Sequence, residues 1–77
     1  MQISVKLLNG RILKTDCEPT DKIIDLKNRL AEIEGIPPVQ QRIVFAGRQL
    51  ADDKTLQECN VNSNSTLNLL LALRGGH

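Results

Sequence analysis

Aromatic side chains are almost absent from this sequence, which has one phenylalanine, Phe45, and neither tyrosine nor tryptophan among its 77 residues. Its core must therefore be built from aliphatic side chains, and hydrophobic residues make up an ordinary 40% of the chain. A chain of this length is expected to form one domain, close to the size at which a single core is only just sufficient.

Cysteine and histidine are also scarce. Cys17 and Cys59 are far apart, no C-x-x-C pattern occurs, and the only histidine is His77. With no sign of secretion, we expect two reduced thiols that act as small apolar residues rather than a disulfide or a metal site. No nucleophile has a partner base, so we expect no enzyme activity, no metal and no cofactor.

The sequence has no long hydrophobic run and no excess of one charge. Ten Lys and Arg nearly balance nine Asp and Glu, which argues against a nucleic-acid partner. No run approaches the roughly 20 apolar residues of a membrane span, and the first residues do not resemble a signal peptide. We therefore expect a monomer in the cytoplasm and nucleus.

Alternating hydrophobicity predicts an antiparallel hairpin at the start of the chain. Residues 1–7 place apolar side chains at every odd position, which is typical of a half-buried strand. Asn9-Gly10 is a strong hairpin turn signal. A second strand over about 11–17 would turn Leu13, Thr15 and Cys17 inward.

A helix is predicted at about 22–34, after Pro19. Thr20 or Asp21 could cap its start, and Gly35 with Pro37-Pro38 would end it. Apolar residues recur at helical spacing, and polar residues including Lys27 fill the other face. The apolar positions are Ile23, Leu26, Leu30 and Ile33.

The second half of the chain predicts more strands: 40–45, a short one at 48–49, and 66–72. In the first of these, Gln41, Ile43 and Phe45 share one side, while Arg42 and Val44 share the other. The polar stretch 52–64 would be anchored by Leu56 and Val61. This order of elements indicates an α+β fold, with a mixed sheet packed across one helix.

The chain ends in a pattern that adds nothing to a core. Leu71-Ala72-Leu73-Arg74 leads into Gly75-Gly76, and His77 follows. Glycine has no Cβ, so such a backbone can enter a channel too narrow for other residues. We interpret the two glycines as a functional end that a partner's active site can hold.

Three stretches resemble ubiquitin: MQISVKLLNG at the start, GIPPVQQRIVFAGRQL at 35–50, and LLLALRGG at the end. The resemblance runs without a gap over residues 1–76. It implies the ubiquitin-like β-grasp fold over 1–72, a flexible conjugation tail at 73–76, and a one-residue extension, His77, that is either a precursor residue or a tag remnant. It also implies a modifier joined to target lysines through the Gly76 carboxylate, with Gly75 beside it.

The residue at position 72 separates two types within this family. Ala72 stands where ubiquitin has arginine and where the Nedd/Rub modifiers of cullin ligases have alanine, and this position helps activating enzymes distinguish the two. The resemblance thus implies partners in the form of activating, conjugating and ligating enzymes, cullin-type targets and a C-terminal processing protease, with tail contacts from Leu71, Leu73 and Arg74. Because Gln2 and Phe45-Ala46-Gly47 are closer to ubiquitin, a divergent ubiquitin stays open. A ubiquitin-fold binding module that is never conjugated is a second alternative, against which Gly75-Gly76 argue.

The lysines and surface aliphatics complete the predicted site. Lys6 and Lys27 match chain-forming lysines of ubiquitin and are possible acceptors, whereas Arg48 and Ser63 replace its main acceptors. The resemblance and strand parity together predict a partner-binding patch and a second patch. The first comprises Leu8, Val44, Leu70, Asn68, Arg42 and Arg48, and the second comprises Ile36, Leu71 and Leu73 beside Leu8.

Two departures from ubiquitin concern the interior. Cys59 replaces a tyrosine whose hydroxyl holds the loop near Ala51, so we expect a looser 51–63 segment. Thr15 replaces an apolar core residue, and its hydroxyl needs a hydrogen-bond partner.

Overall fold

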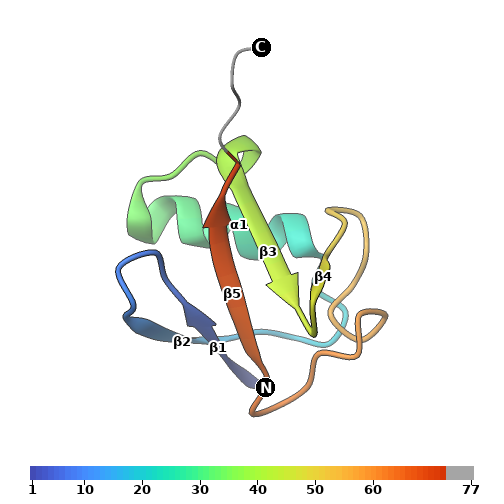
Figure 1. Ribbon diagram of the computed structural model, residues 1–77. Coiled ribbons are helices and arrows are strands. Elements are labelled where there is room, and N and C mark those ends of the chain that lie inside the picture. The colour runs from blue at the N-terminus through green and yellow to red at the C-terminus, as the bar shows by residue number, and fades with distance from the viewer. Residues whose placement is uncertain (73–77) are drawn as a thin grey trace.

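The computed structural model describes residues 1–72. A five-stranded sheet in the order β2-β1-β5-β3-β4 curves across one helix, α1 (Figure 1). The central pair β1 and β5 is parallel and the other pairs are antiparallel, which confirms the predicted mixed sheet and α+β class. The elements are β1 (Gln2–Lys6), β2 (Ile12–Asp16), α1 (Ile23–Glu34), a 3-10 helix η1 (Pro38–Gln40), β3 (Gln41–Phe45), β4 (Arg48–Gln49) and β5 (Thr66–Leu71).

The first hairpin forms where the Asn-Gly pair predicted it. β1 and β2 pair from Gln2 opposite Asp16 to Lys6 opposite Ile12. Gly10 adopts the left-handed conformation, with φ 86°, whereas Asn9 acts through its side chain, whose Oδ1 accepts the Arg11 N–H at 3.0 Å. The turn thus needs one glycine with positive φ and one short polar acceptor.

The ends of α1 differ from the prediction at the start and agree with it at the finish. Lys22, rather than Thr20 or Asp21, is the N-cap, because the Asp25 carboxylate reaches back to accept the Lys22 N–H at 3.0 Å. At the other end Gly35 takes φ 74° and donates its N–H to the Ala31 carbonyl at 2.8 Å.

Two side chains of α1 lie opposite to their predicted sides. Lys27, which we assigned to the polar face, is buried, while Ile33, which we assigned to the core, is half exposed. The helix advances about 100° per residue, so Lys27, four residues after Ile23, falls inside the buried stripe. Ile33 falls about 80° from Ile23, at the margin of that stripe.

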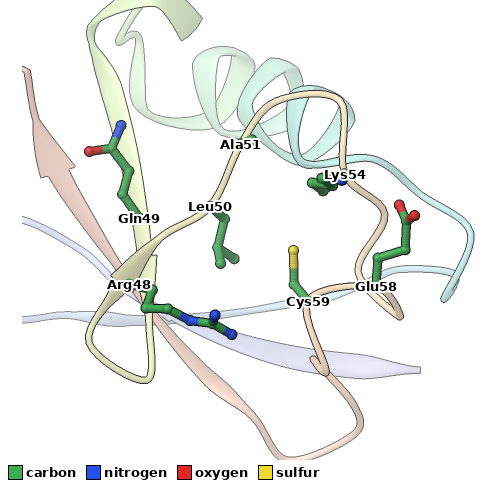
Figure 2. Close-up of a pocket in the computed structure, with 7 residues that line it drawn as sticks. All are labelled: Arg48, Gln49, Leu50, Ala51, Lys54, Glu58 and Cys59. Atoms are coloured by element: carbon green, nitrogen blue, oxygen red, sulfur yellow. The ribbon is translucent and has the colours of Figure 1, made fainter.

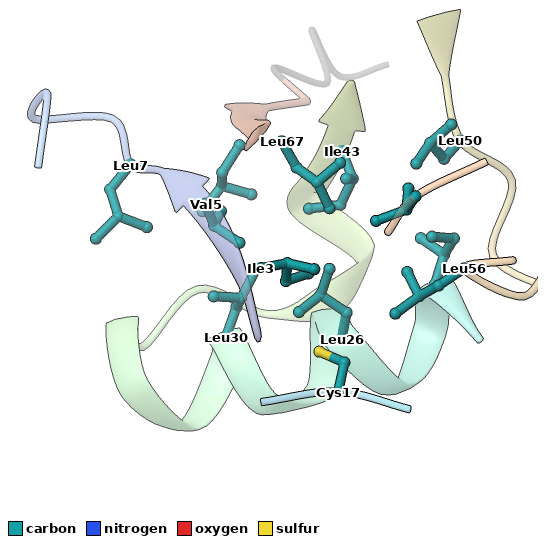
Figure 3. Close-up of a cluster of buried hydrophobic side chains, with 13 residues drawn as sticks. Ile3, Val5, Leu7, Cys17, Leu26, Leu30, Ile43, Leu50, Leu56 and Leu67 are labelled. Atoms are coloured by element: carbon teal, nitrogen blue, oxygen red, sulfur yellow. The ribbon is translucent and has the colours of Figure 1, made fainter. Parts of the chain in front are cut away.

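The core lies between the sheet and α1, as Figure 3 shows, and its hydrophobic side chains are aliphatic apart from one cysteine. Strand parity predicted its strand residues correctly, and Leu56 and Val61 anchor the segment 51–63 as expected. Phe45 packs only at the edge of this cluster. The buried hydrophobic residues are Ile3, Val5, Leu7, Cys17, Ile23, Leu26, Leu30, Ile43, Leu50, Leu56, Val61, Leu67 and Leu69.

Two polar side chains inside the described part of the chain bond to neighbouring elements, although the buried Gln41 Oε1 has no hydrogen-bond partner. Arg29 Nη1 lies 3.5 Å from Thr15 Oγ1 and also donates to the Asp16 carbonyl, so the expected need of the Thr15 hydroxyl is met by α1. Gln41 Nε2 donates to the carbonyls of Lys27 and Ile36, each at 2.8 Å. Within residues 1–72, α1 is too short and too polar to cross a membrane.

Candidate functional site

The outer face of the sheet brings most of the predicted partner-binding patch together. Arg42 lies opposite Leu70 and Val44 lies opposite Asn68 across β3 and β5, so these four side chains share one face. It is the face away from α1, since Ile43, Leu67 and Leu69, which alternate with them, are buried in the core.

Two aliphatic side chains of this patch are clearly open to solvent. Leu70 is 48% exposed and Leu8, in the turn between β1 and β2, is 49% exposed. Val44 is half-buried between them and the short strand β4. The register also adds Lys6, which lies opposite Asn68 on the β1 side. The surface therefore combines aliphatic side chains with the cations Arg42 and Lys6.

Arg48 does not lie on this face. It pairs with Phe45 across β3 and β4, while Gln49 pairs with Val44, so Gln49 occupies the position that we had assigned to Arg48. Figure 2 shows Arg48 directed toward Cys59 and Gln49 directed the opposite way. Phe45 belongs to the inward-facing series of β3, and Arg48 lies on the same side of the sheet because the two residues are cross-strand partners.

Arg48 instead lines an open hollow between β4 and the segment 51–63, drawn in Figure 2. Its wall includes Lys54, Glu58 and Cys59. Burial raises the pKa of the Cys59 thiol and the nearby Glu58 carboxylate raises it further, against weaker opposing effects of Arg48 and Lys54. A thiol with a raised pKa is a poor nucleophile at neutral pH, so the hollow has no evident catalytic chemistry.

Cys17 is equally unreactive in its surroundings. Burial raises the pKa of this thiol, and the Arg29 guanidinium opposes the effect without cancelling it. Neither cysteine forms a disulfide in the structure. Among residues 1–72, no three His, Cys, Asp or Glu side chains come together in a way that could hold a metal ion.

The base of the tail is anchored to the body of the domain. The Ala72 N–H donates to the Gln40 carbonyl at 2.7 Å, one residue beyond the pair formed by Leu71 and Gln41. Ala72 therefore sits at a fixed point at the end of β5. Of the second patch, Leu71 is 39% exposed and Ile36 is half-buried. The other predicted tail residues lie outside the described part of the chain: Leu73, Arg74, Gly75, Gly76 and His77.

The two possible acceptor lysines differ in accessibility. Lys6 is exposed on the sheet face. Lys27 is buried, and its Nζ lies 2.6 Å from Asp52 Oδ1 in a salt bridge. An amine held in this way cannot reach an incoming thioester unless α1 moves, so the folded domain leaves only Lys6 of the two open to modification. Sequence parity gave no warning of this, because the partner Asp52 is 25 residues away.

Gln41 is a structural residue that the sequence signalled only weakly. Its predicted inward parity put an amide at a core position, and the structure buries it to 2% exposure. There it links the carbonyls of Lys27 in α1 and Ile36 to the start of β3. These bonds hold the start of β3 in place, directly after Gln40, whose carbonyl accepts the Ala72 N–H.

The comparisons with known proteins agree with this geometry. The profile of the Ubiquitin family matches residues 3–74. The chain is 51% identical over 76 residues to the ubiquitin-like protein NEDD8 of Dictyostelium discoideum, covering 99% of both chains. It is 51% identical over 76 residues to the NEDD8-like protein RUB3 of Arabidopsis thaliana, covering 99% of this chain and 97% of that protein.

A more distant relative keeps the same full-length match. The NEDD8-like protein RUB1 of Saccharomyces cerevisiae is 38% identical over 77 residues, covering all of both chains. Likeness to these proteins supports a ubiquitin-like modifier of the Nedd/Rub type, a protein tag without enzyme activity of its own. The chain belongs to the ubiquitin family.

Proposed function

We propose that this protein is a Nedd/Rub-type modifier that becomes covalently attached through the carboxylate of Gly76 to lysines of cullin subunits in ubiquitin ligases. The observation that carries the proposal is the full-length similarity to NEDD8-like proteins, together with Ala72 at the position where this type differs from ubiquitin. The anchored position of Ala72 supports it, because an enzyme would meet this residue in one fixed place.

The chemistry asks little of the domain itself. An activating enzyme joins the Gly76 carboxylate to the α-phosphate of ATP with release of pyrophosphate, and an enzyme cysteine then displaces AMP to form a thioester. After transfer to a conjugating enzyme, the ε-amine of a target lysine attacks the thioester carbonyl and releases the thiol. This chain supplies the carboxylate and the surfaces that those enzymes hold, so it needs no cofactor of its own.

A C-terminal residue after Gly76 would block that chemistry. With His77 present, the carbonyl of Gly76 is an amide rather than a free carboxylate. If His77 is part of the precursor, a processing protease must therefore remove it before Gly76 can be activated.

The outer sheet face supplies weak contacts to partners. Leu8 and Leu70 are about half exposed and Val44 is exposed to a smaller extent, so burying what remains contributes about 2–4 kcal/mol at about 1.5–3 kcal/mol per fully buried side chain. The loss of translational and rotational freedom on association offsets most of this. Such a patch acts best when the modifier is already tethered to its target.

The experiment is a thioester assay with a chain ending at Gly76, which retains every element of the described domain 1–72. The chain is incubated with ATP and with either a Nedd-type or a ubiquitin-type activating enzyme, and the product is resolved with and without a reducing thiol. We expect a thiol-sensitive adduct with the Nedd-type enzyme. The matched variant Ala72→Arg should lose loading on that enzyme and gain it on the other.

The alternatives predict different patterns in the same assay. A thioester with the ubiquitin-type enzyme alone would identify a divergent ubiquitin. No thioester with either enzyme would identify a ubiquitin-fold binding module that is never conjugated. For the target, mass spectrometry of the endogenous protein should find the Gly76 carboxylate in an isopeptide bond to a cullin lysine.

A further inference from the structure

Val39 is the most exposed large hydrophobic residue within residues 1–72, at 72% of its free surface. It lies in the 3-10 turn η1, directly after Pro37-Pro38. The turn is closed by the Gln40 N–H, which donates to the Pro37 carbonyl at 2.9 Å. Proline fixes φ, so the valine is presented on a rigid support and not on a loose loop.

This side chain lies at the base of the tail. The carbonyl of Gln40, the next residue, accepts the Ala72 N–H at 2.7 Å. The register of β3 and β5 continues from Leu71 opposite Gln41 into this bond. A protein that holds the chain beyond Ala72 must therefore approach the turn that carries Val39.

The two segments that meet at this junction carry no charge of their own. Residues 35–41 contain no charged side chain, and neither do residues 66–72. Leu71 is partly exposed across the strand pair and Ile36 is half-buried just before the two prolines. A partner that covers Ala72 thus meets an uncharged turn, with Val39 as its most exposed aliphatic group and the exposed Arg42, opposite Leu70, at its border.

A single exposed valine ordinarily needs no explanation, and it is the location that makes this one informative. Valine has a stiff χ1 and little side-chain entropy to lose when it is buried. A carboxylate at the same place would have to be desolvated against an uncharged partner surface, which is unfavourable. At position 39 the junction therefore favours an uncharged, apolar partner group and disfavours a carboxylate in place of the valine.

We propose that Val39, together with Ala72, is a specificity-determining contact for the activating enzyme, and that the enzyme covers it with an uncharged, apolar surface. This inference rests on the proposed function, since it assigns a further contact for the same reaction. Val39 acts on binding and not on the chemistry at Gly76, so its replacement should raise KM and leave kcat unchanged.

The test measures thioester formation on the Nedd-type enzyme as a function of modifier concentration, with the chain ending at Gly76. We expect Val39→Asp to raise KM about tenfold, which corresponds to about 1.4 kcal/mol, and Val39→Gln to raise it about threefold. The matched control is Ser63→Asp, which adds the same charge at an exposed position before the start of β5, at the opposite end of that strand from Ala72. It should leave KM within twofold of the parent chain.

Each outcome separates this inference from the proposal on which it rests. A parent chain that loads normally while both Val39 variants keep its KM would overturn the role of Val39 and leave the proposed function standing. An equal rise in KM for Ser63→Asp would overturn it as well, because the effect would then be one of net charge. A parent chain that loads on neither enzyme overturns both. Thermal unfolding checks that the variants fold. If Val39→Asp does not fold, the KM of Val39→Gln decides the test.

Discussion

Lys27 offers a way to separate the packing of a charged residue from its ion pair. The residue is buried to 6% exposure on the inner side of α1. Its Nζ contacts Asp52 Oδ1 at 2.6 Å, and the side chain of Asp52 is 56% exposed. The Lys27 side chain is therefore almost fully buried, whereas that of Asp52 is largely exposed to solvent. We consider three variants: Lys27→Ala, Lys27→Met and Asp52→Asn.

The structure assigns most of the stabilisation to the aliphatic stem of Lys27. Its four methylene groups are buried, and at about 0.8 kcal/mol for each group they contribute about 3 kcal/mol. The ion pair contributes about 1 kcal/mol or less, because solvent around Asp52 screens it. Lys27→Ala keeps Cβ and removes three of these groups, about 2.4 kcal/mol, together with the ion pair, so we expect it to lower the free energy of unfolding by about 3 kcal/mol. Lys27→Met keeps an unbranched apolar side chain and should lower it by about 1 kcal/mol.

The assay is urea unfolding at pH 7, with the double variant Lys27→Met with Asp52→Asn completing the cycle. We expect a coupling free energy of about 1 kcal/mol or less between the two sites. If Lys27→Met destabilised the protein as strongly as Lys27→Ala, the ammonium would carry the effect and our reasoning from the stem would be refuted. A coupling free energy of several kcal/mol would refute it as well.

Three further predictions concern Gln41, Gly35 and Glu58. Gln41→Leu should lower stability by about 2 kcal/mol in urea unfolding, because it removes the donor from the buried bond to the Lys27 carbonyl and from the partly buried bond to the Ile36 carbonyl. Gly35→Ala should lower the free energy of unfolding by about 1 kcal/mol, because φ at this residue is 74°, and Gly35→Asn should lower it less. An added Cβ meets nothing within 4 Å, so the backbone conformation alone would cause the loss. An unchanged urea midpoint for Gly35→Ala would contradict this explanation. The Thr55 N–H and hydroxyl lower the pKa of the Glu58 carboxyl below its usual 4.5. The charged carboxylate therefore stabilises the fold above pH 4.5, and this stabilisation is lost as the pH falls through the lower pKa of the folded state. Glu58→Gln should therefore unfold more easily than the parent chain at pH 7 and no more easily at pH 2, and a difference that persists at pH 2 would count against this assignment.

Hydrophobic alternation was enough to predict the sheet. The strands β1, β3 and β5 place every second residue in one core, so a period of two in residues such as Ile3 and Val5 specifies both the strand and its inner face. The end of α1 was equally readable, because the left-handed conformation of Gly35 and the two prolines after it leave the helix no continuation.

The misassigned residues depend on which of several possible partners each residue takes in the folded chain. Burial of Lys27 requires Asp52, which a loop brings to α1. Arg48 leaves the sheet face because β4 pairs with β3 in one particular register. The choice of Lys22 as N-cap follows from the reach of Asp25, which competes with two equally plausible caps before it. Local patterns cannot rank such alternatives.

For the candidate site, the sequence was strong where chemistry depends on residue type and weak where it depends on neighbours. The glycines at 75 and 76 and the alanine at 72 could be singled out without coordinates. Nothing in the sequence marked Val39 as special, because its significance comes from the hydrogen bond that places Ala72 beside Gln40.

The parallel pairing of β1 and β5 has a mechanical consequence. Because the two strands run in the same direction at the centre of the sheet, Met1 and the end of β5 point to opposite ends of the domain (Figure 1). A force that pulls these ends apart loads the hydrogen bonds of β5 with both β1 and β3 in shear, and they must break together rather than unzip one at a time. The domain should therefore resist unfolding by a force applied between its N-terminus and the end of β5 far better than its modest size suggests.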